Sequence, residues 1–262
     1  MNTTAETRPV VLQIEGLTKY FGGLRAVYNF DLTLYDGDLV GLIGPNGAGK
    51  TTIFNQITGL YLPTSGSIKF NGIELVGFEP HEITRLGIAR TFQNIRLFGN
   101  LTVLDNLRIA LHSQAGYSLF DGILMTRKYR QREAEILERA QELLEIMGLT
   151  KVQNELARNL PYGEQRRVEI ARALACSPRL LLLDEPAAGM NPKEITQLMD
   201  LIHFIRDKFK LTVLLIEHQM RLVMGICEQI TVIDFGEIIA RGTPKEIQNN
   251  PRVIEAYLGK GA

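Results

Sequence analysis

The sequence has few cysteines and no excess of either charge. Its 262 residues include two cysteines, Cys176 and Cys227, and neither belongs to a CxxC pair. This pattern excludes a zinc ribbon or a paired redox motif and favours two reduced thiols over a single disulfide. Lysine and arginine together number 29, as do aspartate and glutamate. The resulting net charge of zero argues against nucleic-acid binding as the main role, because neutralising phosphates requires a positive excess.

Long hydrophobic runs are also absent. No run approaches the roughly 18 apolar residues that are needed to span a bilayer, and the longest, such as Leu180–Leu183, have the length of strands. The segment Met1–Val10 lacks a basic region followed by an apolar stretch, so no secretory signal is expected. Apolar residues make up 45% of the chain, which excludes a disordered or collagen-like protein. The sequence predicts a chain that is soluble by itself and able to dock on a membrane partner.

Short apolar runs alternate with helical stretches along much of the chain. Leu39–Ile43 is typical of a buried parallel strand, and Leu180–Leu183 and Thr212–Ile216 are later runs that each follow a helical stretch. Val10–Ile14 and Asp31–Leu34 have strand-like patterns of their own. The alternation predicts an α/β fold with a mostly parallel core sheet.

The middle of the chain has a different pattern. Between about residues 82 and 158 strand signals nearly vanish. Apolar residues recur at helical spacing over residues 132–147, and Gly148 closes this pattern. The stripe is typical of a helix that packs on a core. We therefore expect a helical insertion over about residues 90–165.

Two later helix starts carry the same signal. Asn191–Glu194 offers a cap residue, a proline in the first turn and a glutamate three residues after the cap. Thr243–Glu246 repeats this arrangement. Both segments predict a helix that begins at the proline.

A glycine-rich loop follows the predicted strand Leu39–Ile43. Residues 44–51 match G-x-x-x-x-G-K-[ST] at every fixed position and precede a predicted helix over Lys50–Thr58. Glycines let backbone N–H groups turn inward around a phosphate, and the start of the helix adds partial positive charge. Lys50 can reach the β- and γ-phosphates, for which it should be accessible to solvent, and the Thr51 hydroxyl can bind Mg²⁺. The predicted phosphate-binding residues are Gly44, Pro45, Asn46, Gly47, Ala48, Gly49, Lys50 and Thr51.

Two carboxylates follow the apolar run Leu180–Leu183. Asp184 is expected at the carboxyl end of a strand, which is the edge where open α/β sheets bind ligands. There it can hold Mg²⁺ through water. Glu185 can act as a general base on the attacking water. Alone this pair is a weak signal, but beside a phosphate loop it indicates a hydrolytic site.

A histidine ends the strand predicted over Thr212–Ile216. Glu217 and His218 follow this strand, so His218 is expected at the same sheet edge as Glu185. A lone histidine is more often structural than functional. Its place beside the predicted general base is what favours a functional role.

Two further features complete an ordered set of motifs. Gln93 lies between the phosphate loop and Gly163, and Gly163 opens a predicted helix. The phosphate loop, these two features, the carboxylate pair and the histidine follow one another between about residues 11 and 259. This order resembles the nucleotide-binding domain of ABC transporters, over nearly the whole chain. The resemblance implies a P-loop NTPase fold with an antiparallel β portion near the N-terminus and an inserted helical subdomain.

The resemblance also implies a domain boundary and further site residues. One ATP-binding domain would span residues 10–259, after a flexible segment 1–9. Phe21 is similar to the aromatic residue that stacks on adenine, with Tyr20 as the alternative. Gln93 resembles the glutamine that contacts Mg²⁺ and the attacking water, and His218 would position the γ-phosphate. The implied set adds Val27 and Thr52 to the nucleotide contacts and gives Thr51, Gln93 and Asp184 as Mg²⁺ ligands.

The signature element departs from the family pattern. Residues 160–164 are L-P-Y-G-E where L-S-G-G-Q is usual, so Leu160 and Gly163 match. Pro161 has no hydroxyl for a γ-phosphate, whereas Gly163 at a helix start still supplies N–H groups and a favourable dipole. Asn191 likewise stands where aspartate is usual. The residues expected to bind the ATP of a second subunit, mainly through backbone groups, are Pro161, Tyr162, Gly163 and Glu164.

Several runs resemble more narrowly the ATPases of branched-chain amino acid importers. These runs are Thr91–Phe98, Pro161–Arg167, Glu185–Pro192, Ile216–Met220 and Asn250–Gly259. The resemblance implies an ATPase that uses ATP and Mg²⁺ at the cytoplasmic face of the plasma membrane to power uptake of branched-chain or other neutral amino acids. Its implied partners are a second ATP-binding subunit, identical or paralogous, two permeases docked near Gln93 and the helical insertion, and indirectly a solute-binding protein.

Other functions stay open at this point. The chain could serve another ABC system, such as urea import or lipopolysaccharide export. A P-loop kinase or GTPase is a second alternative, although a guanine-binding N-K-x-D is absent and the Gly163 element has no role in it. A third is a protein that uses ATP as a dimerisation switch without transport.

Overall fold

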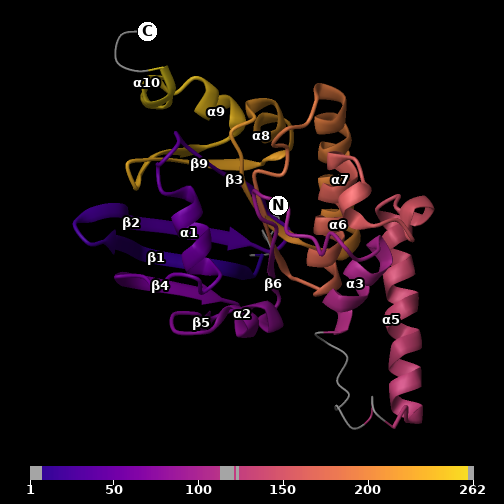
Figure 1. Ribbon diagram of the computed structural model, residues 1–262. Coiled ribbons are helices and arrows are strands. Elements are labelled where there is room, and N and C mark those ends of the chain that lie inside the picture. Colours follow the sequence, from indigo (N-terminus) through magenta and orange to yellow (C-terminus); the bar gives the residue numbers. More distant parts are fainter. Residues whose placement is uncertain (1–7, 113–120, 122–123, 259–262) are drawn as a thin grey trace, which may run out of the picture.

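The structure is a computed structural model that describes residues 8–112, 121 and 124–258. Within these residues the strands form two sheets, and a group of helices packs at one side of them (Figure 1). No helix in the described ranges is long and apolar enough to cross a membrane. Cys176 and Cys227 both lie in the described part and are not joined by a disulfide.

An antiparallel sheet forms most of the first third of the chain. Strands β1 (Val10–Phe21) and β2 (Leu24–Tyr35) make a long hairpin, and the order is β2-β1-β4-β5. Both strands are longer than the sequence pattern predicts. The pairing of β1 with β2 shifts register at several points, and such bulges break the alternation on which the prediction depends. The other two strands are β4 (Ser65–Phe70) and β5 (Ile73–Glu74).

The second sheet has the order β10-β9-β3-β8-β7-β6. Its strands β9, β3, β8, β7 and β6 pair in parallel, and β10 joins β9 in antiparallel fashion. The α/β fold with a mostly parallel core sheet is therefore confirmed. The strands are β3 (Leu39–Ile43), β6 (Ile88–Arg90), β7 (Leu180–Asp184), β8 (Thr212–Ile216), β9 (Gln229–Asp234) and β10 (Glu237–Gly242).

Helices outside the insertion begin close to where the sequence predicts. The phosphate loop leads into α1 (Lys50–Ile57), one residue shorter than expected. Both predicted capping boxes are confirmed, since Asn191 caps α7 (Pro192–Phe209) and Thr243 caps α9 (Pro244–Gln248). The remaining helices of this group are α2 (Pro80–Leu86), α8 (Met220–Ile226) and α10 (Pro251–Leu258).

The helical insertion is present but extends beyond residue 165. Its last helix, α6 (Tyr162–Ala175), packs against α3 (Val103–His112) and α5 (Arg127–Ile146). Helix α5 begins earlier than expected because Thr126 caps its polar first turns, which carry no hydrophobic stripe. Two short 3₁₀ helices, Thr150–Val152 and Ala157–Asn159, connect α5 to α6.

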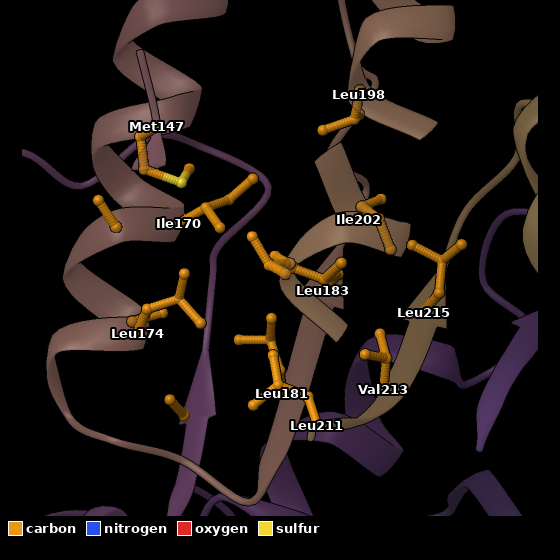
Figure 2. Packing of buried hydrophobic residues seen from close by; sticks show 14 of the residues in the cluster. Met147, Ile170, Leu174, Leu181, Leu183, Leu198, Ile202, Leu211, Val213 and Leu215 are labelled. Carbon is orange, nitrogen blue, oxygen red and sulfur yellow. The ribbon is translucent and has the colours of Figure 1, made fainter. Parts of the chain in front are cut away.

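Two hydrophobic clusters cover the two faces of the parallel sheet. Along β7 the side chains alternate, so that Leu181 and Leu183 belong to one cluster and Leu180 and Leu182 to the other. Figure 2 shows the first cluster, where Leu181 and Leu183 lie among side chains of β8, α6 and α7. Burial of a leucine side chain is worth about 1.5–3 kcal/mol. The core strands are thus fixed from both sides.

The first nine residues were expected to be flexible. Residues 1–7 lie outside the described part of the chain. Arg8 and Pro9 are held in place: a guanidinium nitrogen of Arg8 is 2.7 Å from Asp38 Oδ1, and the Pro9 carbonyl accepts a hydrogen bond from Asp36 N at 2.9 Å. The expectation is therefore wrong for these two residues, which are paired with the turn after β2.

Candidate active site

The predicted phosphate loop connects β3 to α1. Gly44 and Gly49 both have positive φ angles, 155° and 105°. A Cβ atom at Gly44 would clash with the carbonyl oxygen of Ile233, and one at Gly49 with that of Ala26. These close approaches require glycine. They fix the loop between the hairpin strand β2 and the core strand β9.

Lys50 begins α1, and its ammonium group points back into the loop. Nζ donates hydrogen bonds to the carbonyl oxygens of Gly44 and Pro45, at 2.7 and 2.8 Å. The residue is 7% exposed, so the expectation that it is accessible to solvent is wrong. Burial lowers the pKa of Lys50, against the opposing effect of Glu185 and Asp184. The loop carbonyls hold the ammonium where phosphate oxygens would compete for it.

The carboxylate pair lies at the end of β7. Asp184 is its last residue and is buried. Glu185 has a φ of 45°, a left-handed conformation that costs about 1–3 kcal/mol for a residue of this kind. Its backbone N–H donates to the carbonyl of Ile216 on β8 at 2.9 Å, which helps to hold the turn. Because of this conformation, the backbone changes direction immediately after Asp184.

Gln93, Glu185 and His218 meet around one carboxylate oxygen. Gln93 Nε2 donates to Glu185 Oε2 at 2.7 Å, and His218 Nδ1 is 3.5 Å from the same oxygen. The three residues follow β6, β7 and β8, which are neighbours in the parallel sheet. The structure therefore brings together the residues that were predicted for catalysis. A carboxylate held in this way has its orientation fixed for accepting a proton.

The predicted Mg²⁺ ligands surround a single pocket. Thr51, Gln93 and Asp184 line a cavity of about 400 Å³. Hydroxyl, amide and carboxylate oxygens are donors that Mg²⁺ accepts, and this ion usually takes one or two carboxylates and completes its shell with water and phosphate oxygens. In the described residues no group of three His, Cys, Asp or Glu side chains could hold a metal ion. The three oxygen donors that line the pocket fit a magnesium ion whose remaining ligands are water and phosphate oxygens.

Arg90 is a site residue that the sequence analysis did not find. It ends β6, and its Nη2 is 2.7 Å from Asp184 Oδ2 in an ion pair whose side chains are 5% and 4% exposed. Nη1 donates to Asn55 Oδ1 at 2.7 Å. The guanidinium also lies over the rings of Phe54 and Phe92. Arg90 therefore fixes the position of the carboxylate that is predicted to hold the metal.

Glu217 is a second such residue, and it is fully buried. Its Oε1 accepts a hydrogen bond from Ala187 N, and its Oε2 accepts from His218 N and Gln219 N, all at 2.8–2.9 Å. Glu217 joins the segment after Glu185 to the segment that carries His218. Its signal in the sequence was an acidic residue directly after a buried strand.

The residues expected near adenine lie on the N-terminal hairpin. Val27 is buried, and a Cβ at Gly49 would lie 3.3 Å from its Cγ2, so Val27 borders the phosphate loop. Phe21 is at the end of β1 and packs edge-to-face on Tyr61, which lines the same pocket as Thr51. The alternative, Tyr20, is also partly exposed, and its N–H donates to the hydroxyl of Thr64.

The signature residues lie at the start of α6. Pro161 is the cap position, and its carbonyl accepts the N–H groups of Glu164 and Gln165. Residues 161, 163 and 164 line a separate cavity that contains no residue of the phosphate loop. The contact of residues 161–164 with the nucleotide of a second subunit stays a prediction. Asn191, which stands where aspartate is usual, has a structural role: its side chain caps α7.

Comparison with known families gives two matches. Residues 27–188 match the family described as ABC transporter. Residues 237–262 match the family described as branched-chain amino acid ATP-binding cassette transporter. The two matches together span most of the chain.

Individual relatives agree with these matches. The chain is 50% identical over 250 residues to the high-affinity branched-chain amino acid transport ATP-binding protein LivG of Escherichia coli, which covers 95% of this chain and 98% of the relative. It is 48% identical to BraF of Pseudomonas aeruginosa, with 97% and 99% covered. The lipopolysaccharide export ATP-binding protein LptB of Haemophilus influenzae is 35% identical, with 95% and 98% covered.

Solved structures show the same architecture. The ADP conformation of MJ1267, an ATP-binding cassette of an ABC transporter, has a TM-score of 0.84 and 32% identity, with 96% of this chain and 99% of that chain covered. A dimeric post-hydrolysis state of the cassette MJ0796, bound to ADP and Pi, has a TM-score of 0.75 and 27% identity, with 89% and 98% covered.

The Arg90–Asp184 pair gives a testable prediction. Arg90→Lys keeps the positive charge but cannot bridge Asn55 and Asp184 as the planar guanidinium does. Loss of a charged hydrogen bond is worth about 1.5–3 kcal/mol, so we expect ATPase turnover to fall about 10- to 100-fold, with a higher Mg²⁺ concentration needed for half-maximal rate. Steady-state ATPase assays across a magnesium titration measure both effects.

Arg179→Lys is the matched control for Arg90. Arg179 forms an exposed pair with Asp36 at 3.3 Å, with side chains 46% and 40% exposed, and exposed pairs contribute little. This variant should stay within about twofold of the parental rate. If Arg90→Lys has the magnesium dependence and rate of the parental chain, Arg90 does not position Asp184 for catalysis.

Proposed function

Because this chain belongs to the ABC transporter family of ATPases, we propose that it is the ATP-hydrolysing subunit of an importer for branched-chain or other neutral amino acids. The observation that carries the proposal is 50% identity with LivG over 95% of the chain. The match of residues 237–262 to the branched-chain amino acid cassette family supports it. Family membership also removes the P-loop kinase and GTPase alternative.

The phosphate loop would hold the triphosphate. Its N–H groups and Lys50 would contact the β- and γ-phosphates, and Thr52 follows in the first turn of α1. Thr51, Gln93 and Asp184 would hold Mg²⁺, which supplies positive charge that neutralises the phosphates. Phosphoryl transfer to water needs mainly positioning and charge stabilisation, and this pocket contains groups for both.

Glu185 would take the proton from the attacking water. Gln93 and His218 both contact its Oε2, so the carboxylate is oriented before the reaction. Glu217 accepts hydrogen bonds from the N–H of Ala187 and from the N–H groups of His218 and Gln219. It thereby holds the segment after Glu185 against the segment that carries His218. His218, whose Nδ1 is 3.5 Å from Glu185 Oε2, would contact the γ-phosphate that the water attacks.

The remaining nucleotide contacts would come from the hairpin of the same chain and from a second subunit. Phe21, with Tyr20 as the alternative, and Val27 would receive the adenine from the chain's own hairpin. Residues 161–164 would contact the nucleotide of a second ATP-binding subunit, identical or paralogous. The dimeric cassette of MJ0796 supports an assembly of two subunits.

Permease subunits would dock on a groove beside Gln93. The groove has a volume of about 800 Å³ and lies between the loop after β6 and the helical insertion. Phe92, Phe98 and Ile109 give it an apolar lining, with Arg96 and Arg172 beside them. Two permeases bound there would place the chain at the cytoplasmic face of the membrane, with a solute-binding protein on the other side.

Lipopolysaccharide export is the second candidate. It is supported by the 35% identity with LptB over 95% of the chain. The higher identity with LivG and BraF and the C-terminal family match favour import.

Transport can be measured directly. We expect the complex purified with the permeases that copurify with this chain, reconstituted in liposomes with its solute-binding protein, to take up leucine, isoleucine or valine when ATP is supplied to the ATPase side. A complex with Lys50→Ala should show no uptake, because the main side-chain contact to the phosphates is lost. Stimulation of ATPase activity by urea or lipopolysaccharide, with no response to the amino acids, would contradict the proposed substrate class.

The signature element gives a separate prediction. A Cβ at Gly163 would lie 3.5 Å from Glu194 Oε1, so a side chain fits there. Gly163→Asp should lower the ATPase rate of the assembled transporter at least about tenfold, because a carboxylate at this helix start repels the γ-phosphate of the partner's nucleotide. Gly163→Asn, which has the same size without the charge, should retain several-fold more activity. Equal rates in the two variants and the parental complex would remove residues 161–164 from the nucleotide site.

A further inference from the structure

A buried arginine lies between the loop of Gln93 and the start of α6. Arg166 is fully buried. Its Nη1 donates to the Phe92 carbonyl at 2.7 Å and to Glu169 Oε2 at 2.6 Å. Its Nη2 donates to the Gln93 carbonyl and to the Tyr162 hydroxyl, both at 2.9 Å. A single guanidinium thus joins two segments that are about 70 residues apart in sequence.

The surroundings show that this arginine is bound firmly. A buried charge is costly unless it is paired and hydrogen-bonded, and Arg166 is both. Its partner Glu169 is also buried, and Glu169 Oε1 accepts the N–H of Phe92 at 3.1 Å. Burial raises the pKa of Glu169, and Arg166 opposes this effect. Helix α6 therefore holds the backbone of Phe92 by both its N–H and its carbonyl.

Arg166 joins two residues from different parts of the site, Gln93 and Tyr162. Gln93 carries the side chain that contacts Glu185 at 2.7 Å. Tyr162 is the first residue of α6 and is 41% exposed. A Cβ at Gly189, four residues after Glu185, would lie 3.8 Å from Cε1 of the tyrosine ring. The tyrosine ring thus lies near the segment that follows the general base, and its hydroxyl contacts Arg166.

We propose that Arg166 is a positioning residue that couples the placement of Gln93 to the start of α6, with the Tyr162 hydroxyl as its contact there. The proposal rests on the proposed function, in which residues 161–164 contact the nucleotide of the second subunit. A shift of α6 when that nucleotide binds moves the guanidinium, and the guanidinium moves the carbonyls of Phe92 and Gln93. Each subunit thereby adjusts its own hydrolytic site to the nucleotide of its partner.

The coupling depends on the shape of the guanidinium. Its two terminal nitrogens lie in one plane and each donates in two directions, which an ammonium group on a flexible stem does not reproduce. The tyrosine is equally specific, because its hydroxyl is the group that accepts from Arg166. This contact gives a physical role to Tyr162, which stands where the family pattern has glycine.

Tyr162→Phe is the most selective test, because it removes the hydroxyl and leaves the ring. We expect amide hydrogen exchange in residues 91–96 of the full chain to rise about 2- to 10-fold, which corresponds to the loss of one hydrogen bond, and the thermal midpoint to fall by no more than a few degrees. Arg166→Lys should raise exchange in the same segment by at least as much. In the assembled transporter, Tyr162→Phe should lower the Hill coefficient for ATP toward 1 and reduce turnover less than tenfold.

Matched controls separate this coupling from general loosening. Tyr28→Phe removes a hydroxyl from another partly exposed tyrosine next to an arginine, and Arg167→Lys changes the neighbouring residue of α6. Both should leave exchange in residues 91–96 and the Hill coefficient unchanged. The proposal is overturned if Tyr162→Phe and Arg166→Lys leave that exchange at the parental value, or if the controls change it equally.

The exchange measurement is independent of the proposed function. It needs neither the amino-acid substrate nor turnover, so a failure of leucine transport leaves its result valid. If exchange rises but the Hill coefficient stays at the parental value, the contact exists without coupling the two sites, and the proposal is overturned as well. Loss of all ATPase activity in the parental complex would instead contradict the proposed function.

Discussion

The alignment of the parallel strands at one edge of the core sheet is the constraint on which the site depends. Asp184 on β7 pairs in register with Ile216 on β8, and Leu42 on β3 pairs with the same residue. Both faces of these strands are buried, so a slip by one residue would move each leucine to the opposite cluster. The residues that follow the strands therefore meet at fixed positions.

Buried charges at this edge are held by specific partners. Lys50 is bound by two loop carbonyls, Asp184 by Arg90, and Glu217 by three backbone N–H groups. Each arrangement offsets the cost of removing a charge from water, and each fixes a group next to the phosphate site. The network around Arg166 extends the same principle to the helical insertion. Preorganised charge of this kind is what catalysis of phosphoryl transfer mainly requires.

The sequence predicted those parts of the structure that depend on neighbouring residues alone. The phosphate loop, the strands β3 and β8 and the capped helix starts follow from glycine spacing, apolar runs and cap residues. Arg90 and Arg166 were missed because each depends on a distant partner: Asp184 is 94 residues from Arg90, and Phe92 is 74 residues from Arg166. In addition β6, with three residues, gives no strand signal. The burial of Lys50 was also missed, because it depends on the path of the loop backbone rather than on residue type.

The central claim is that Glu185 is the general base of an ATP-hydrolysing site. Glu185→Gln keeps the size and the contacts with Gln93 and His218 but cannot accept the proton. The account predicts unchanged ATP affinity and a fall in turnover of about 10²- to 10⁴-fold, measured by nucleotide binding and single-turnover hydrolysis on the same preparation. Glu228→Gln serves as the control, because the Glu228 side chain is 51% exposed and pairs with Arg206, and it should hydrolyse ATP at the parental rate. Turnover by Glu185→Gln close to the parental rate would contradict the account.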